Sequence, residues 1–357
     1  MGGNAVVHVI GTGTIGEPLI GLLSSLKEQL GIDEVTFHKR TPLLTDRSKV
    51  HSLMRKGAML CVDDSAAKAF QDLAMEPTYE AIEALNRASV VIDCTPSGVG
   101  ISNKIKYYEE YTKNTLGFIA QGSEAGFGKP YARGINDSAL IRDQDKFIQV
   151  VSCNTHNLSI LVQALAFQDG GPDNLIEGRF VCMRRANDIS QEGSYVPSPQ
   201  VGRHKDERFG THHARDAWHL YQTLDYDLNL FSTAIKLNTQ YMHTIFFDIR
   251  VKNETNVERL LEHIQANDRM ALTYKSSANA VFSFGRDQGH YGRILNVTVV
   301  CQPTLAVRNG NEIVGYCFTP QDGNSLLSSL SAATWLLYPD DYEDRIQCLK
   351  PFFYDEV

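Results

Sequence analysis

A glycine-rich turn between an apolar strand and a helical pattern is the feature that most constrains the fold of this chain. Residues 5–10 have the pattern of a buried strand, the glycine-rich motif at 11–16 follows at once, and helical spacing continues over 18–30. Glycines at these spacings permit a tight turn and a close approach to a pyrophosphate, which the helix N-terminus binds. This context favours a dinucleotide site over an incidental turn. The predicted cofactor contacts are Gly11, Thr12, Gly13, Thr14, Ile15 and Gly16.

The second strand, residues 34–37, ends in basic residues where an NAD enzyme carries an acidic residue for the ribose 2′-hydroxyl. A 2′-phosphate carries negative charge, and basic side chains can pair with it. We therefore expect NADP as the cofactor, with NAD also usable, although a solvated strand end would show the same pattern. The residues predicted to lie at the adenosine ribose are His38, Lys39 and Arg40.

Strands and helices alternate through the rest of the first half, which predicts a Rossmann-type, doubly wound parallel sheet. The end of the chain adds an apolar helix over residues 322–337, which we expect to return to this domain. The dinucleotide-binding domain is therefore expected over 1–152, completed by a C-terminal part of about 320–357. Predicted strands lie at 89–94, 116–120 and 147–151, and predicted helices at 79–86 and 103–113.

Two further segments are expected to contact the cofactor. Ligands bind beyond the carboxyl ends of strands in such sheets, and the loop at 93–100 follows one of these strands directly. A plain tight turn is the alternative for this loop. The second segment is the start of the C-terminal helix. The predicted contacts are Thr95, Pro96, Gly98 and Asn324.

The pattern changes after residue 152, where strands lengthen and fewer helices separate them. This favours an α+β catalytic domain with a mixed or antiparallel sheet over 153–319. The polar stretch at 187–215 is too irregular for core and is expected to be a long functional loop or a subunit contact. Predicted strands lie at 179–185, 231–237, 241–251 and 293–302, and a predicted helix at 256–267.

Cys153 is the strongest candidate for a catalytic side chain. An apolar strand at 147–151 precedes it and an amphipathic run at 158–167 follows with helical spacing, so the cysteine lies just before or at the first turn of a helix. Unpaired amides and the helix dipole stabilise a thiolate there, so we expect the Cys153 pKa to lie well below about 8.5. A thiolate attacks carbonyl carbon, which suggests covalent catalysis. A buried structural cysteine is the alternative.

Composition narrows the function classes. Seven cysteines without a C-x-x-C pair fit neither a disulfide framework nor a zinc site, so no metal is predicted and a reducing cytoplasm is expected. A net charge of −8 argues against a general nucleic-acid binder. No apolar stretch approaches the roughly 20 residues of a membrane span, and residues 1–5 lack the blocks of a signal peptide.

Several short motifs occur in a consistent order through most of the chain. Besides the glycine-rich motif they are Asp-x-Thr-Pro-x-Gly-x-Gly at 93–100, Gln121-Gly122-x-Glu124, Val-Val-Ser-Cys-Asn-Thr at 150–155, Arg184-Arg185-Ala186, His212-His213 and Met242-His243. Taken together, they resemble the archaeal-type (type II) phosphorylating glyceraldehyde-3-phosphate dehydrogenases, of which this chain resembles a divergent member.

The resemblance implies a function. The chain is then an NAD(P)-dependent oxidoreductase of glycolysis and gluconeogenesis. It reversibly converts glyceraldehyde 3-phosphate and inorganic phosphate to 1,3-bisphosphoglycerate through a cysteine thiohemiacetal and a thioester. The small-molecule partners are a phosphorylated aldehyde and phosphate, and the assembly is a homo-oligomer, a tetramer by resemblance.

The resemblance also implies roles for residues. Cys153 is the nucleophile and His243 its acid/base partner, although a histidine in an apolar strand is otherwise a core residue. The arginine and histidine pairs bind substrate phosphates, whereas doubled arginines at a strand end otherwise face solvent. Gln121 and Gly122 join the cofactor contacts. The implied substrate or phosphate contacts are Ser152, Asn154, Thr155, His156, Arg184, Arg185, His212 and His213.

The chain departs from the family pattern at His156, where the family has a second threonine that is thought to help bind phosphate. If His156 takes that role, phosphate affinity rises as the pH falls through its pKa, near 6.5 if unperturbed. The alternatives are a related semialdehyde dehydrogenase, a non-phosphorylating aldehyde dehydrogenase and a non-catalytic dinucleotide-binding protein.

Overall fold

The structure is a computed structural model that describes residues 4–111, 115–122, 124–189, 191, 193, 195–320 and 322–357. The chain divides into two units, and each unit draws on more than one stretch of the sequence. The first unit comprises Met1–Arg133, Leu140–Val150 and Ser325–Lys350, and the second comprises Gly134–Ala139, Val151–Asn324 and Pro351–Val357.

The first unit is built on a parallel sheet. Its strands, as far as the described residues show, are β1 (Val6–Ile10), β2 (Glu34–His38), β3 (Met59–Val62), β4 (Tyr79–Glu80), β5 (Val90–Asp93), β6 (Gly117–Gln121), β7 (Lys129–Tyr131) and β8 (Phe147–Val150). Their order is β4-β3-β2-β1-β5-β6-β8-β7, and every pairing is parallel. The order reverses at β1, so the turns after β1 and β5 meet at the switch point where ligands bind in such sheets. The predicted fold class is confirmed.

Helices connect these strands. They are α1 (Gly16–Ser25), α2 (Lys27–Leu30), α3 (Arg47–Arg55), α4 (Ala67–Asp72), α5 (Ala81–Arg87), α6 (Val99–Asn103), α7 (Glu109–Tyr111) and α13 (Tyr342–Arg345), together with most of α12 (Gly323–Leu337). A π-helical turn, Lys104–Tyr108, joins α6 to α7. Helix α2 ends at Gly31, whose φ of 72° is the left-handed conformation that glycine adopts at no steric cost.

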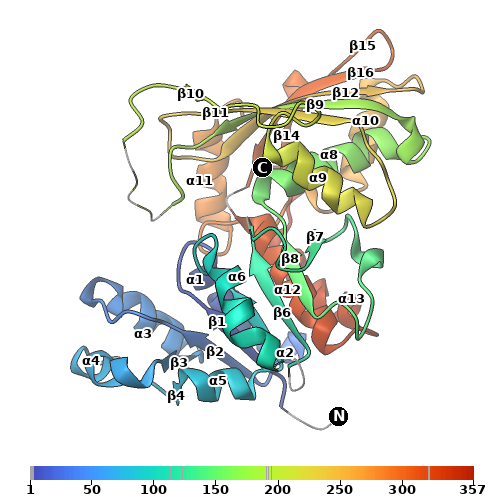
Figure 1. Ribbon diagram of the computed structural model, residues 1–357. Coiled ribbons are helices and arrows are strands. Elements are labelled where there is room, and N and C mark those ends of the chain that lie inside the picture. The colour runs from blue at the N-terminus through green and yellow to red at the C-terminus, as the bar shows by residue number, and fades with distance from the viewer. Residues whose placement is uncertain are drawn as a thin grey trace. The chain divides into compact units, whose positions relative to one another are not determined.

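The C-terminal helix α12 packs against β6, as Figure 1 shows for the red helix beside that strand. Gln121 of β6 donates a hydrogen bond to the hydroxyl of Ser329 over 2.7 Å. A side chain at Gly117 would come within 2.7 Å of Leu336, so glycine lets the helix approach the strand closely. Residues far apart in the sequence therefore build this unit together.

The second unit contains a mixed sheet. Its described strands are β9 (Leu175–Arg184), β10 (Gln200–Val201), β11 (Leu230–Lys236), β12 (His243–Val251), β13 (Met270–Thr273), β14 (Thr298–Cys301), β15 (Ala306–Arg308) and β16 (Glu312–Thr319). The order is β10-β11-β9-β12-β16-β14-β13, with β15 on β16. The pairs β9–β11 and β13–β14 are parallel and the others antiparallel. The mixed sheet agrees with the prediction.

Strand β12 alternates strictly between buried and partly exposed residues, which places every second side chain on the core face. His243 shares that face with Ile245 and Phe247. The helices of this unit are α8 (Cys153–Val162), α9 (His212–Gln222), α10 (Val257–Gln265) and α11 (Ala278–Gln288). Figure 1 shows α8 and α9 side by side next to the sheet, and Asn157 of α8 bonds to Thr319 of β16 over 2.7 Å. The buried face of β12 therefore looks onto this helical layer.

Four elements of this unit differ from what the sequence indicated. Helix α8 is not amphipathic, because residues 154–162 are all buried. Helix α9 begins at His212, inside the stretch expected to be irregular, because residues at helical spacing, Ala214, Ala217 and Tyr221, pack inward. The strand expected at 293–302 is confined to β14, and β16, which was not predicted although its sequence is mostly apolar, lies centrally in the sheet.

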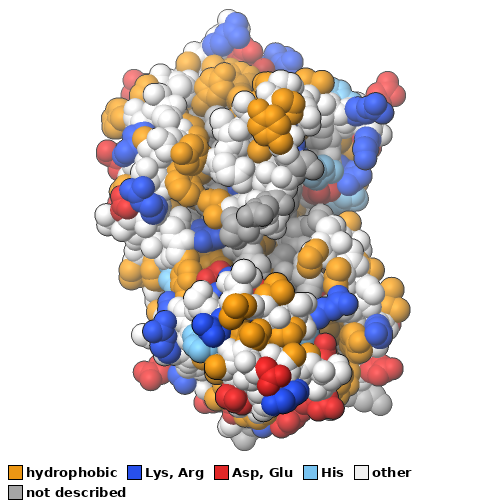
Figure 2. Space-filling view, turned by 90° about the vertical axis from the view of Figure 1, so that its left-hand side faces the viewer, with side chains coloured by type: hydrophobic (Ala, Val, Ile, Leu, Met, Phe, Trp, Pro, Cys, Tyr) orange, Lys and Arg blue, Asp and Glu red, His pale blue; other side chains and the backbone are white. Residues whose placement is uncertain are grey.

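The surface carries charges of both signs. On the face in Figure 2, acidic and basic side chains are interspersed among hydrophobic ones. Among the residues that the structure describes, no helix is both long enough and apolar enough to cross a membrane.

His8 predicts how the first unit responds to acid. It lies in β1 with only 1% of its surface exposed, and its Nδ1 lies 2.7 Å from the Thr36 hydroxyl. Burial, assisted by the nearby His38, lowers the His8 pKa from 6.5 to about 3. Below pH 6.5 the unfolded chain therefore binds a proton at His8 that the folded protein does not bind. The contribution of His8 to the free energy of unfolding is fully present above about pH 6.5 and is lost as the pH falls from 6.5 to 3.

Because of His8 alone, we expect the free energy of unfolding to be about 2 kcal/mol lower at pH 5 than at pH 7. Urea unfolding at both pH values should show a smaller loss in His8→Leu than in the unsubstituted protein. His219, exposed on α9, supplies the control, since His219→Leu should keep the full pH dependence. Equal pH dependence in all three proteins would contradict the interpretation.

Candidate active site

The glycine-rich turn after β1 has the shape of a dinucleotide cradle. Gly11 has a φ of +97°, and a Cβ at Gly16 would lie 2.1 Å from the Gly11 carbonyl oxygen, so both positions require glycine. A Cβ at Gly13 would meet no protein atom within 4 Å. Gly13 therefore leaves room beside the N-terminus of α1, which suits a close pyrophosphate. Thr12, Thr14 and Ile15 complete the turn, and the Thr12 carbonyl accepts a hydrogen bond from Lys49 over 3.2 Å.

Lys49 was not predicted from the sequence. It lies on α3, 37 residues from Thr12, and no local pattern links the two. Its ammonium group also lies 3.7 Å from Glu17 and 3.5 Å from Asp46. A cation therefore lies directly beside the glycine-rich turn.

The three basic residues after β2 differ from one another. Lys39 is buried and donates a hydrogen bond to Asp46 over 2.5 Å, so a carboxylate already partners its charge. His38 lies 3.3 Å from Asp63, and burial lowers its pKa against the opposing effect of that carboxylate. Arg40 is exposed. Of the three, Arg40 is the side chain best placed to meet a ligand from solvent.

Two buried carboxylates shape the loop after β5. Asp93 accepts hydrogen bonds from the Thr95 amide at 2.9 Å, from Asn103 at 2.9 Å and from the Tyr108 hydroxyl at 2.6 Å. Glu124 accepts from the amides of Gly98 and Ile101, at 2.5 Å and 2.8 Å. The loop that contains Thr95, Pro96 and Gly98 is thus held at both ends. Pro96 and Gly98 are exposed.

Gln121 and Gly122 end β6 in the same unit. The Gln121 amide donates to Ser329, whereas its carbonyl oxygen is buried without a hydrogen-bond partner among the described residues. Asp93 and Glu124 lie in the motifs that carry the resemblance, but their role in holding the loop becomes visible only in three dimensions.

Cys153 is the first residue of α8. Ser152 caps the helix, because its hydroxyl accepts a hydrogen bond from the Thr155 amide over 3.3 Å. The first amides of a helix have no intrahelical acceptor, so those of Cys153 and Asn154 can serve a developing oxyanion. The strand-to-helix position of Cys153 is as predicted.

His243 faces the thiol from β12. Its Nδ1 lies 3.8 Å from the Cys153 sulfur and 2.9 Å from the Asn154 side-chain oxygen. The two residues are 90 positions apart, and the alternation of β12 brings the ring onto the core face next to α8. A nucleophile and a base within reach of each other can perform covalent catalysis.

Asn324 contacts the Cys153 backbone. Its side-chain amide donates a hydrogen bond to the Cys153 carbonyl oxygen over 3.1 Å. Its own carbonyl oxygen is fully buried without a hydrogen-bond partner among the described residues. An acceptor without a donor suits the carboxamide of a nicotinamide. Each unit by itself therefore offers groups that fit part of an NAD(P) cofactor, the room at Gly13 in the first unit and the Asn324 side-chain oxygen in the second.

The predicted low pKa of the Cys153 thiol is wrong. Burial and the Asp322 carboxylate raise the Cys153 pKa to about 11, although the nearby Arg185 and Arg184 lower it. Desolvation disfavours a thiolate more than the helix end favours it. The His243 pKa lies well below 6.5 because of burial and the same two arginines. The pair is therefore a neutral thiol beside a neutral imidazole at pH 7.

The raised Cys153 pKa predicts how alkylation depends on pH. With a pKa of about 11, the Cys153 thiolate fraction rises about tenfold per pH unit between pH 7 and 9. The rate of modification by iodoacetamide, followed by mass spectrometry of the Cys153 peptide, should rise in the same way. An alkylation rate that does not change between pH 7 and 9 would indicate that Cys153 is already a thiolate at pH 7. The low Cys153 pKa expected from the sequence would then be correct.

The two predicted arginines have different environments. Arg185 is buried, and its guanidinium contacts Asp188 at 2.6 Å and Asp322 at 3.4 Å. Arg184 is exposed at the end of β9. Arg185 is therefore held by two carboxylates, whereas Arg184 can meet an anion directly.

The two predicted histidines open α9. Their ring centroids lie 3.9 Å apart, with His212 exposed and His213 buried. Neither ring nitrogen of His213 has a hydrogen-bond partner among the described residues. Burial lowers the His213 pKa well below 6.5, and the nearby His212, Arg184 and His243 lower it further. The histidine pair, Arg184 and the Cys153–His243 pair thus lie close enough to influence one another.

His156 does not have the environment that its predicted phosphate role requires. Its ring is 1% exposed, and its Nδ1 lies 3.0 Å from the Ser152 carbonyl oxygen. Burial lowers the His156 pKa to about 4. The His156 imidazole is therefore neutral at pH 7. Because its pKa lies near 4 and not near 6.5, we no longer expect phosphate affinity to change near pH 6.5 through this residue.

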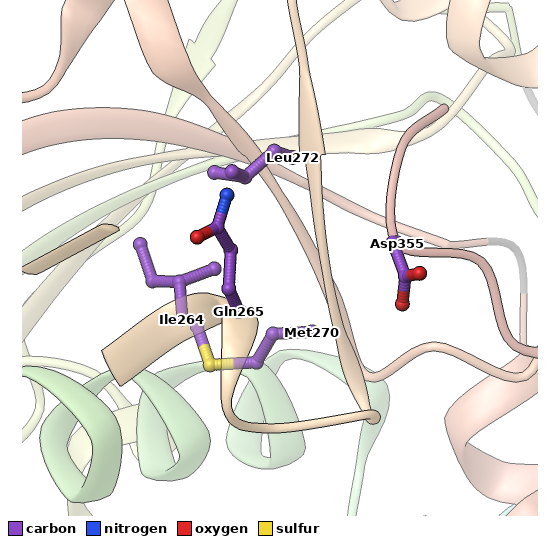
Figure 3. A pocket seen from close by; sticks show the side chains of 5 residues that line it. All are labelled: Ile264, Gln265, Met270, Leu272 and Asp355. Atoms are coloured by element: carbon purple, nitrogen blue, oxygen red, sulfur yellow. The ribbon is translucent and has the colours of Figure 1, made fainter. Parts of the chain in front are cut away.

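A separate cavity lies in the second unit. It has a volume of about 240 Å³ and is lined by Ile264, Gln265, Met270, Leu272 and Asp355. Figure 3 shows the side chains from the end of α10 and from β13 gathered together, with Asp355 on the C-terminal segment. None of these five residues is a predicted site residue.

A Rossmann-type parallel sheet with a glycine-rich turn, together with a cysteine–histidine pair on a mixed-sheet unit, defines a class of candidate dinucleotide-dependent enzymes. No model of a known protein family matches the sequence. The chain is similar to the glyceraldehyde-3-phosphate dehydrogenase of Sulfolobus acidocaldarius, at 27% identity over 322 residues, which cover 86% of this chain and 84% of the relative.

Two further archaeal relatives carry the same name. The protein of Metallosphaera sedula is 26% identical over 320 residues, which cover 86% of this chain and 85% of the relative. That of Methanobacterium bryantii is 28% identical over 276 residues, which cover 74% and 73%. These matches support a distant relationship to the glyceraldehyde-3-phosphate dehydrogenases.

Proposed function

We propose that this protein is an NAD(P)-dependent, phosphorylating glyceraldehyde-3-phosphate dehydrogenase. The observation that carries the proposal is the Cys153–His243 pair, 3.8 Å apart at the start of α8. The distant similarity to enzymes of that name supports the same reaction class.

Cys153 forms the covalent bond to substrate. Its sulfur adds to the aldehyde carbon while the thiol proton passes to the carbonyl oxygen, so the addition creates no net charge and suits a thiol with a raised pKa. The amides at the start of α8 stabilise the oxygen as negative charge develops on it. The product is a thiohemiacetal.

His243 accepts the hydroxyl proton of the thiohemiacetal while the hydride leaves the thiohemiacetal carbon. The product on Cys153 is a thioester. The bound dinucleotide supplies the nicotinamide carbon that accepts the hydride. His243 is neutral at pH 7 because its pKa is lowered, so it is ready to accept a proton. Inorganic phosphate then attacks the thioester carbon, releases the thiolate and gives the acyl phosphate.

The substrate phosphates are held by Arg184, His212 and His213. Arg184 offers a guanidinium, whose fork geometry matches phosphate oxygens. Arg185 contributes from further back, since its contacts with Asp188 and Asp322 fix the chain next to Arg184. Ser152, Asn154 and Thr155 contribute donors from the start of α8.

The cofactor is held by the glycine-rich turn, the loop over 95–98, Gln121, Gly122 and Asn324. We propose NADP as the preferred form because Arg40 is exposed after β2 and Lys49 lies beside Thr12. Lys39 is a weaker candidate than the sequence suggested, since Asp46 already pairs with it.

Arg40→Ser is expected to weaken NADP binding by about 5- to 100-fold, because a charged hydrogen bond to the 2′-phosphate is lost. The affinity for NAD should change by less than twofold. Fluorescence titration with both cofactors therefore measures how much the 2′-phosphate contact contributes to NADP affinity. The matched control is Arg142→Ser, which removes an exposed arginine that pairs with Asp340. Equal losses for NAD and NADP would argue against a 2′-phosphate contact.

The proposed function is tested by a steady-state assay of glyceraldehyde 3-phosphate with NADP or NAD, with and without phosphate. We expect cofactor reduction that depends on phosphate, with acyl phosphate as the product. Free acid formed at a rate independent of phosphate would instead make this a non-phosphorylating dehydrogenase. Turnover of amino-acid semialdehydes alone would indicate a related semialdehyde dehydrogenase, and cofactor binding without turnover a non-catalytic protein.

A further inference from the structure

One nitrogen of the His243 ring has two neighbours. Nδ1 lies 2.9 Å from the Asn154 side-chain oxygen and 3.8 Å from the Cys153 sulfur. An amide oxygen has no hydrogen and can only accept, so the hydrogen in the shorter contact must lie on Nδ1. A neutral imidazole carries a single ring hydrogen. Its lone pair therefore lies on Nε2.

The Cys153 contact agrees with this tautomer. If the sulfur becomes a thiolate, it too is an acceptor, and the hydrogen on Nδ1 serves it. The 2.9 Å contact with Asn154 thus places a hydrogen on Nδ1, and the longer Cys153 contact is compatible with it, because a thiol sulfur is a weak acceptor and a thiolate a strong one. In consequence Nδ1 cannot take the proton of the thiol, which is consistent with a thiol that stays protonated at neutral pH.

From this geometry we propose that Asn154 is a positioning residue. It locks His243 in the tautomer with the hydrogen on Nδ1, and so makes Nε2 the nitrogen that accepts the substrate hydroxyl proton. The assignment of that proton-accepting step rests on the proposed function, whereas the tautomer does not.

The position of Asn154 suits this role. It is 2% exposed in the first turn of α8, directly after the nucleophile, so helix and cap fix its side chain relative to Cys153. The charged and titratable groups that act on His243 or share its surroundings are Arg184, Arg185, His213 and Cys153. The two arginines disfavour the imidazolium, and Asn154 then decides which neutral tautomer remains.

Asn157 supplies a matched control on the same helix. It is also a buried asparagine, but its amide donates to Thr319 over 2.7 Å and its oxygen accepts from the Cys317 thiol over 3.4 Å. Removal of either asparagine amide costs a buried hydrogen bond. Only the substitution of Asn154 removes a contact with His243.

The first test is nitrogen NMR of the histidine-labelled full-length protein without substrate, with His243 assigned by comparison with His243→Gln. We expect the His243 signals of a protonated Nδ1 and an unprotonated Nε2. Asn154→Leu should move them toward a mixture of tautomers, whereas Asn157→Leu should leave them unchanged. A hydrogen on Nε2 in the unsubstituted protein would overturn the proposal, whatever reaction the protein catalyses.

The second test is kinetic. Asn154→Leu should lower kcat for aldehyde oxidation by about 10- to 100-fold with little change in KM, because the base is in the wrong tautomer part of the time. Asn154→Asp keeps an acceptor, and its charge should restore part of the rate and move the acidic limb of the kcat–pH profile upward by about one unit or more. Loss of rate in both variants without a shift of the limb would reduce Asn154 to a packing role. Correct tautomers in a protein that oxidises no aldehyde would count against the proposed function alone.

Discussion

Replacement of Cys153 by alanine is expected to lower aldehyde oxidation by about 10⁴-fold or more and to leave dinucleotide binding intact. Without the sulfur no covalent thiohemiacetal forms, and the neighbouring imidazole has no adduct on which to act. The glycine-rich turn belongs to the other unit and does not include Cys153. The cofactor dissociation constant should therefore change by less than about threefold, as measured by fluorescence titration.

Cys153→Ser refines this experiment, because a hydroxyl of similar size keeps the packing but is a far poorer nucleophile. Cys348→Ala, at a partly exposed cysteine in the first unit, controls for the loss of any thiol and should retain full activity. Full activity in Cys153→Ser would remove covalent catalysis from consideration. Acid quenching during turnover of the unsubstituted enzyme should trap an acyl group on Cys153.

The second large effect is expected for His243→Gln. Loss of the base should reduce kcat by about 10²- to 10⁴-fold, because the hydroxyl proton must then leave to water. The thiol remains, so single-turnover experiments should still show covalent addition, with hydride transfer as the slow step. A kinetic isotope effect on the aldehydic hydrogen should therefore increase.

The matched control is His219→Gln, at an exposed histidine on α9. It should keep normal kcat and normal pH dependence. If His243→Gln retained more than half of the activity, another group would have to accept the proton, and the 3.8 Å contact would be structural only.

The parts that could be predicted from the sequence are those set by neighbours along the chain. The glycine-rich turn lies between β1 and α1 because short-range sterics require glycine at Gly11 and Gly16. Cys153 opens a helix because Ser152 caps it. The fold class followed from the alternation of strands and helices, and the parallel and mixed sheets confirm it.

The remaining features depend on contacts between distant parts of the chain. His243 reaches Cys153 across 90 residues through the register of β12, and the Arg185–Asp322 contact spans 137 residues. No local spacing indicates either. The sign of the Cys153 pKa shift was missed for the same reason, since burial and Asp322 are supplied by the tertiary structure.

The same long-range dependence explains why Lys39 and His156 have other surroundings than the sequence suggests. Each has the charge or hydrogen-bonding capacity for an anion, but Asp46 partners the lysine and the Ser152 carbonyl lies against the imidazole. A side chain whose polar atoms are already satisfied within the protein gives up those contacts before it can serve a ligand. The sequence shows the group but not its existing partner.

The discontinuous first unit has a consequence for how the protein is made. Gln121 and Gly117 of β6 have their packing partners Ser329 and Leu336 on α12. During synthesis these partners emerge from the ribosome about two hundred residues after β6, when all strands of the mixed sheet have already been translated. The strands of the mixed sheet are therefore available for pairing before the parallel sheet receives its last helix, and the second unit is completed later still, by Pro351–Val357. In chains that are released before α12 is made, one face of β6 would remain uncovered. We expect such chains to bind chaperones and to be cleaved by proteases.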